Sequence, residues 1–207
     1  MKKIVFLALL LFSVTLLASH AAVSSGPSAG NGGANFYNSV GNYFSVTQTD
    51  VNVVRAKGIP DEEIPVVFFL AKEAKVAPST IMNLRKKGKS WMGITKRFGY
   101  GPEIYYISID SNVEIVPPYD RTLGYFNSKP KKDWNTISLR DDEIINLVNL
   151  KFMSKFFKYP PENIMKMRQD NKGFSAISDE IVNQKNPDHA TGTKKQEGKA
   201  KKFIKKI

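Results

Sequence analysis

Residues 64–98 read IPVVFFLAKEAKVAPSTIMNLRKKGKSWMGITKRF, and residues 147–181 read LVNLKFMSKFFKYPPENIMKMRQDNKGFSAISDEI. The two segments align without a gap at a shift of 83 residues, and nine of the 35 aligned positions are identical. The matched apolar positions recur at the three- and four-residue spacing of a helix face. The pattern predicts a duplicated helical unit, over residues 61–98 and 141–181.

Each unit is predicted to contain three helices separated by short breaks. The acidic runs at residues 61–63 and 141–143 mark the first helix of each unit, because acids in a first turn favour the positive end of the helix dipole. Pro78 suits the first turn of a second helix, and Gly88 ends that helix. Ser90 is the predicted N-cap of the third helix. Three helices with a turn between the last two have the helix-turn-helix plan.

The segment between the two units is predicted to form β-structure. Residues 103–109 (EIYYISI) are rich in β-branched and aromatic residues, which is typical of a strand. Further short strands are expected at residues 113–116, 123–126 and 136–139. Residues 36–57 are expected to form a short strand or helix packed on the body. The predicted fold class is α+β and mostly helical, with two related trihelical, helix-turn-helix-like units joined by a small β element.

The first unit resembles a known sequence family. Leu84–Ile94 (LRKKGKSWMGI) is similar to the L-R-x-x-G-x-S-W-x-x-I stretch of a family of uncharacterised exported bacterial proteins. In that family the stretch follows a V-x-P segment like residues 76–78 and precedes an F-G-x-x-P-E turn like residues 98–103. The resemblance covers about residues 36–183. It implies a helix-turn-helix-like core and an envelope or secreted location, but no known activity.

The N-terminus has the layout of a secretory signal peptide. Lys2 and Lys3 precede an apolar run over residues 4–17, and small residues follow it. The run is shorter than the ~20 residues that a membrane-spanning helix needs. We therefore expect residues 1–21 to be a signal peptide, cut after Ala21 or, as the alternative, after Ala18. The mature protein is expected to be periplasmic or secreted.

The rest of the chain is expected to be a linker, a globular domain and a tail. Residues 22–35 are rich in small residues, Gly and Ser, which predicts a flexible linker; residues 36–183 are the globular domain. Residues 184–207 predict a disordered basic tail, since residues 183–207 hold eight lysines and two acids in a chain of net charge +12. The tail either binds anionic lipid or another polyanion or only keeps the protein soluble.

The composition excludes several classes of enzyme. The chain has no cysteine and two histidines, His20 in the predicted signal peptide and His189 in the predicted tail. Thiol catalysis is excluded, and zinc sites and serine–histidine triads nearly so. No catalytic residue, metal or cofactor is therefore assigned. A pair of carboxylates could still act as acid and base, with the candidates Glu62, Glu63, Glu103, Asp110, Asp120, Asp141 and Asp142.

The candidate binding residues belong to the first unit and are mostly basic. Cationic side chains on a helix-turn-helix plan suit a polyanion, and aromatic residues are enriched at binding surfaces. The predicted set is Arg85, Lys86, Lys87, Lys89, Trp91, Lys96, Arg97 and Tyr100. Core packing is the first expectation for its aromatic residues. Arg85, like Arg168, is expected to pair with helix acids such as Glu73 or Glu62.

Three functions are compatible with these residues. The first is an exported, non-enzymatic interaction module of the envelope or periplasm, which binds a protein or a polyanion. The alternative is a carboxylate-dependent envelope enzyme that acts on glycan, and a cleft with two carboxylates about 5–9 Å apart would favour it. A core with carboxylates only at helix ends would favour the module. The third, a DNA-binding protein, requires the signal peptide to be wrong.

Overall fold

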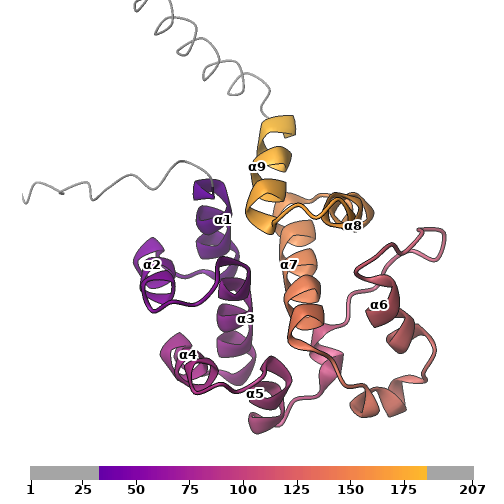
Figure 1. The fold of residues 1–207 in the computed structure, drawn as a ribbon, viewed down its shortest axis with the longest axis horizontal. Coiled ribbons are helices and arrows are strands. Elements are labelled where there is room, and N and C mark those ends of the chain that lie inside the picture. The colour runs from indigo at the N-terminus through magenta and orange to yellow at the C-terminus, as the bar shows by residue number, and fades with distance from the viewer. Residues whose placement is uncertain (1–32, 186–207) are drawn as a thin grey trace, which may run out of the picture. The chain divides into compact units, whose positions relative to one another are not determined.

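The computed structural model describes residues 33–185, and over this range the fold is all-α (Figure 1). The α-helices are α1 (Ala34–Phe44), α2 (Gln48–Ala56), α3 (Ile64–Ala74), α4 (Pro78–Lys86), α5 (Trp91–Arg97), α6 (Asp120–Asn127), α7 (Asp141–Phe157), α8 (Pro161–Gln169) and α9 (Phe174–Lys185). Short 3-10 helices lie among them: η1 (Asp61–Glu63), η2 (Pro102–Tyr105) and η3 (Lys131–Thr136).

Several sequence-based expectations fall outside this range. The predicted signal peptide (1–21), residues 22–32 of the predicted linker (22–35) and residues 186–207 of the predicted tail (184–207) lie beyond the described residues. The ends that are described are helical rather than flexible: residues 34–35 belong to α1, and residues 184–185 belong to α9. Within residues 33–185, no helix has both the length and the apolar character that crossing a membrane requires.

The predicted β element is wrong, because the described part of the chain contains no strand. Residues 103–109 begin in η2 and continue as irregular chain. Their aromatic side chains pack on other rings: Tyr105 lies 5.6 Å from Phe69, and Tyr106 lies 4.6 Å from Trp134, between ring centroids. A β-rich composition forms a ladder only beside a partner strand, and this segment uses its large side chains to fill space between helices instead.

The other three predicted strands are also absent. Residues 123–126 lie in α6, where Leu123 and Phe126 are buried about one turn apart. Residues 113–116 are irregular. Residues 136–139 alternate between exposed and buried positions, as a strand does, but pair with no other strand. The fold class is therefore all-α rather than α+β.

Local signals explain where several helices begin. Thr47 and Asp50 form a capping box at the start of α2: the Asp50 N–H donates to Thr47 Oγ1 (3.1 Å), and the Thr47 N–H donates to Asp50 Oδ2 (2.9 Å). Ser90 is the N-cap of α5, as predicted, and its hydroxyl accepts from the N–H of Gly93 (3.1 Å). Residues 36–57, expected to be strand or helix, lie largely in α1 and α2.

The two predicted trihelical units correspond to α3–α4–α5 and α7–α8–α9. The second helix of each unit begins at a proline, Pro78 in α4 and Pro161 in α8. The residue that ends the first helix, Lys75 or Lys158, has the left-handed conformation in both units, with φ of 54° and 48°. The two members of each pair are 83 residues apart, which is the shift of the sequence repeat. The backbone thus repeats where the sequence repeats.

Helices α3 and α7 lie side by side at the centre of the fold, and α1 packs against both (Figure 1). The fully buried Phe152 of α7 joins these elements. Its ring centroid lies 5.3 to 6.1 Å from the rings of Phe36, Tyr43 and Phe44, all on α1. Aromatic side chains contribute much of the apolar area that a core buries, so this cluster fixes α1 on the repeated units.

We expect Phe152→Ala to lower the free energy of unfolding by about 3–5 kcal/mol, because it leaves a cavity among the aromatic rings of α1 and α7. Urea denaturation followed by circular dichroism measures the change. Val53→Ala is the control, since Val53 is 47% exposed and its loss should cost less than about 0.5 kcal/mol. A similar cost for both variants would contradict the assignment of Phe152 to the core.

Candidate functional site

The predicted binding residues lie mainly on α4, α5 and the turn between them, residues 87–90. Gly88 in this turn has φ of 77°, which glycine adopts without strain. Its counterpart in the second unit, Asn171, has φ of 59°, and asparagine tolerates this conformation better than most residues. Each of the two donates its N–H to the carbonyl three residues earlier, at 2.9 and 3.0 Å. The two turns therefore present their side chains from matching backbone positions.

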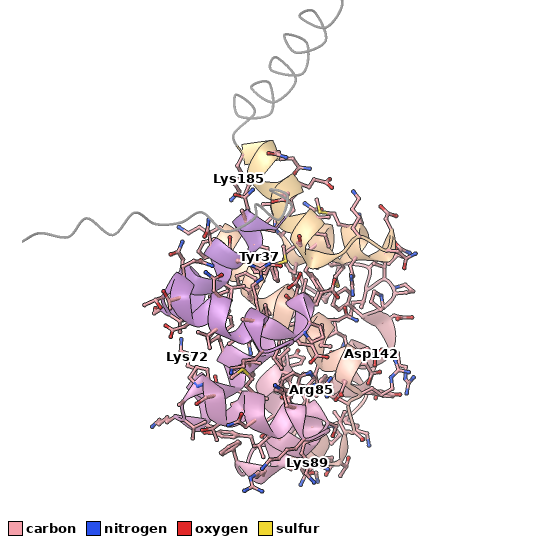
Figure 2. The ribbon with its side chains drawn as sticks, turned by 60° about the vertical axis from the view of Figure 1, so that its left-hand side comes forward. Tyr37, Lys72, Arg85, Lys89, Asp142 and Lys185 are labelled. Atoms are coloured by element: carbon pink, nitrogen blue, oxygen red, sulfur yellow. The ribbon has the colours of Figure 1, made fainter. Side chains whose placement is uncertain are left out.

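Arg85, labelled in Figure 2, is largely buried and contacts the start of α7. Its guanidinium donates to both carboxylate oxygens of Glu63, from Nε at 2.8 Å and from Nη2 at 2.7 Å. Nη1 donates to Oδ2 of Asp141 (2.5 Å) and to the carbonyl of Lys89 (3.2 Å). The guanidinium carbon lies 4.7 Å from the ring centroid of Trp91. The hydrogen bonds to Glu63 raise the pKa of Arg85, so this arginine stays charged.

Asp141 belongs to the second unit, so its contact with Arg85 joins the two units. The other oxygen of this carboxylate, Oδ1, accepts from the backbone N–H of Trp91 (2.7 Å), the first residue of α5. The first N–H groups of a helix have no partner within the helix. One carboxylate of α7 therefore both neutralises an arginine of the first unit and caps a helix of that unit.

The second unit has a related arrangement, in which the carboxylate comes from the first unit. Arg168 donates to both carboxylate oxygens of Glu62, which belongs to the first unit (3.1 and 2.8 Å). Glu62 Oε1 also accepts from the N–H of Phe174, the first residue of α9 (3.2 Å). Arg168 further donates to Asn146 Oδ1 (3.2 Å) and to the carbonyl of Lys172 (3.0 Å), and both contacts have counterparts 83 positions earlier. We call Asp141 and Glu62 the exchanged carboxylates.

The expectation that both arginines pair with acids is confirmed, with Glu62 as the partner of Arg168. The partners of Arg85 are Glu63 and Asp141. The sequence did not reveal Asp141, because it lies 56 positions away and the dipole of its own helix explains an acid there. The sequence does contain one hint of a buried ion pair at Arg85. An arginine occupies the aligned position in both units, Arg85 and Arg168, although the two units differ at most positions.

The structure places three of the predicted binding residues in internal contacts. Arg85 forms the ion pairs described above, and Trp91 is fully buried. Tyr100 is half-buried and donates its hydroxyl to the carbonyl of Glu73 (2.6 Å). These side chains hold the first unit together and do not offer an exposed aromatic platform.

The other five predicted residues are exposed and cationic, and we call them the basic surface. They come from the end of α4, the following turn and the end of α5 (Figure 1), and Lys89 lies at the lower edge of the molecule in Figure 2. None of the five has a carboxylate partner within residues 33–185. The basic surface consists of Lys86, Lys87, Lys89, Lys96 and Arg97.

The charge of the basic surface can be compared with that of the aligned segment in the second unit. Residues 78–98 contain six basic residues and no acid, whereas the aligned residues 161–181 contain three basic and four acidic residues. At three positions of the basic surface the aligned residue has the opposite charge, the pairs being Lys87/Asp170, Lys96/Asp179 and Arg97/Glu180. Because both segments form the same helices and turn, the fold itself does not require a cationic surface.

The acids considered for catalysis divide into paired and exposed groups. The exchanged carboxylates and Glu63 are held by arginines. Asp142 accepts from Arg140 at the surface (2.9 Å), and Glu103 accepts from the N–H of Gly101 (3.0 Å). The exposed candidates are Glu103, Asp110, Asp120 and Asp142. Most of these acids thus serve ion pairs or lie in solvent.

One surface hollow of about 640 Å³ is lined by two carboxylates, those of Asp110 and Glu162, together with serine, proline, isoleucine and valine residues. Asp110 is exposed. The acid of a carboxylate-dependent enzyme is usually buried among apolar groups, whereas Asp110 is open to solvent. Among residues 33–185, no group of three or more acidic or histidine side chains is placed to hold a metal ion.

Comparison of the chain with family models, with curated proteins and with solved structures found no match.

We expect Asp141→Asn to lower the free energy of unfolding by about 1–3 kcal/mol, because the substitution removes the ionic partner of Arg85 and weakens the cap of α5. Asp142→Asn is the matched control: it removes the same charge from the same helix end, but its carboxylate is 61% exposed and its salt bridge should contribute less than about 1 kcal/mol. Urea unfolding of both variants measures the difference. Equal losses of stability in the two variants would show that any acid at the start of α7 contributes as much as Asp141, and would contradict the special role of its contacts with Arg85 and Trp91.

Proposed function

We propose that the protein is an exported, non-enzymatic binding module whose basic surface binds an anionic polymer. The observation that carries this proposal is the contrast between the two units. Residues 78–98 have six basic residues, of which only Arg85 has a carboxylate partner within residues 33–185, and no acid, while the same backbone in residues 161–181 has three basic and four acidic residues. Like charges gathered without counter-charges repel one another. The basic surface thus carries a cost in charge repulsion and is not required by the fold. This combination supports a role in binding.

The character of this surface favours a polyanion over a folded protein partner. Protein interfaces usually have a core of aromatic or aliphatic anchors surrounded by a polar rim. On α5 the apolar residues Trp91, Met92 and Ile94 are buried, and among the described residues the one strongly exposed large apolar side chain is Val53, on α2. Binding through cations alone fits a polymer whose repeated anionic groups release counterions.

Binding of this kind should depend on Lys86 and Lys87, which follow one another at the end of α4 and have no acid nearby in the chain. We expect K86Q/K87Q to weaken binding of linear polyphosphate or poly-glutamate about thirtyfold, at about 1 kcal/mol for each lysine near an anionic surface. K155Q/K166Q is the matched control, since it removes two exposed lysines from the second unit. It should change the affinity less than about twofold.

Fluorescence anisotropy with labelled polymers, over a range of salt concentrations, measures these affinities. The full mature chain is used, so that the lysines near the C-terminus are the same in every variant. Equal losses in the two double variants would assign binding to net charge instead of the basic surface. A wild-type chain that binds neither polymer at low salt would refute the proposed function.

The proposed location rests on the N-terminal sequence, with its two lysines, short apolar run and small residues. We expect cleavage after Ala21, and the mature protein in the periplasm or outside the cell. Fractionation of bacteria that express the chain, followed by mass spectrometry of its N-terminus, tests this. An intact Lys2 on protein recovered from the cytoplasm would refute export and return DNA to consideration as the anionic polymer.

A further inference from the structure

Two cations of the basic surface occupy positions that form a salt bridge in the second unit. There, Nζ of Lys172 donates to Oε2 of Glu180 at 2.7 Å. This hydrogen bond raises the pKa of Lys172. The residues 83 positions earlier are Lys89 and Arg97. The first unit therefore has a lysine where the second has a lysine, but an arginine where the second has the carboxylate.

The backbone that carries these two pairs is the same in both units. The turn before the third helix has matching hydrogen bonds, and that helix begins with its N–H on an exchanged carboxylate in each unit. Glu180 is the seventh residue of α9, and Arg97 is the seventh and last residue of α5. Lys89 and Arg97 thus start from positions whose counterparts bring a cation and a carboxylate into contact.

We propose that Lys89 and Arg97 form a subsite for one oxyanion, a carboxylate or a phosphate group, of the polymer bound by the basic surface. This inference rests on the proposed function and deepens it. The bound oxyanion takes the part that the Glu180 carboxylate plays in the second unit. The ammonium group of lysine acts as a point charge, and the planar guanidinium of arginine can donate two parallel hydrogen bonds to carboxylate or phosphate.

The electrostatics of the free protein support the same assignment. Both side chains are exposed, and neither has a carboxylate partner within residues 33–185. Two cations at the positions where a cation and an anion meet in the second unit repel each other until an anion lies between them. An incoming oxyanion is attracted by both and removes this repulsion, so the pair contributes more to binding than two separate surface cations.

The test replaces Arg97 with the residue that the second unit has at the aligned position. In R97E, the introduced carboxylate can accept from Lys89 as Glu180 accepts from Lys172, so the substitution withdraws both cations from the polymer. K96D is the matched control: it changes the net charge by the same amount, also introduces the aligned residue of the second unit, and leaves Lys89 and Arg97 in place. K89E is a second test variant, which forms the pair in the opposite direction.

Binding of linear polyphosphate and of poly-glutamate to the full mature chain is measured for each variant, with circular dichroism as the check of folding. We expect R97E and K89E to weaken binding about fivefold more than K96D does, the loss expected for one additional cation. The polymer for which this excess appears identifies the oxyanion as phosphate or carboxylate. Equal losses in R97E, K89E and K96D would refute the subsite and leave the proposed function standing, whereas failure of the wild type to bind either polymer would refute both.

Discussion

The exchange of carboxylates between the two units is the interaction on which the rest of the structure depends. Asp141 of the second unit holds Arg85 and caps α5, and Glu62 of the first unit holds Arg168 and caps α9. A largely buried arginine without its carboxylate would carry a large desolvation cost. The second unit therefore needs Glu62 of the first to balance Arg168, and each unit supplies a carboxylate that caps the third helix of the other.

The helical part of the fold could be read from the sequence, but the connection between the units could not. The repeat, the proline that begins α4 and the Ser90 cap follow from local rules of helix formation, so the sequence contains them directly. The β element failed because strand formation depends on a partner strand, which no local pattern supplies. Residues 103–109 have the composition of a strand, but the large side chains of Tyr105 and Tyr106 fill space between helices instead.

The exposed residues of the candidate site could also be predicted from local sequence, whereas the ion pairs of the site could not. The lysines at the end of α4 are exposed, as any run of lysines on a short helix tends to be, and the sequence was enough to select them. Arg85 belonged to the same run of basic residues, yet it lies within ion pairs because of acids 22 and 56 positions away. What separates Arg85 from Lys86 and Lys87 is its repetition as Arg168, which reflects a shared structural task.

The exchange of carboxylates also sets an order of events for a chain made from its N-terminus. Trp91 is synthesised 50 residues before Asp141, the acid that receives its N–H, so α5 emerges with only the Ser90 cap of its own unit. Glu62, by contrast, is already present when Phe174 appears. In a chain made from its N-terminus, the start of α5 therefore gains its second cap only when the second unit appears, whereas the start of α9 finds its carboxylate already present.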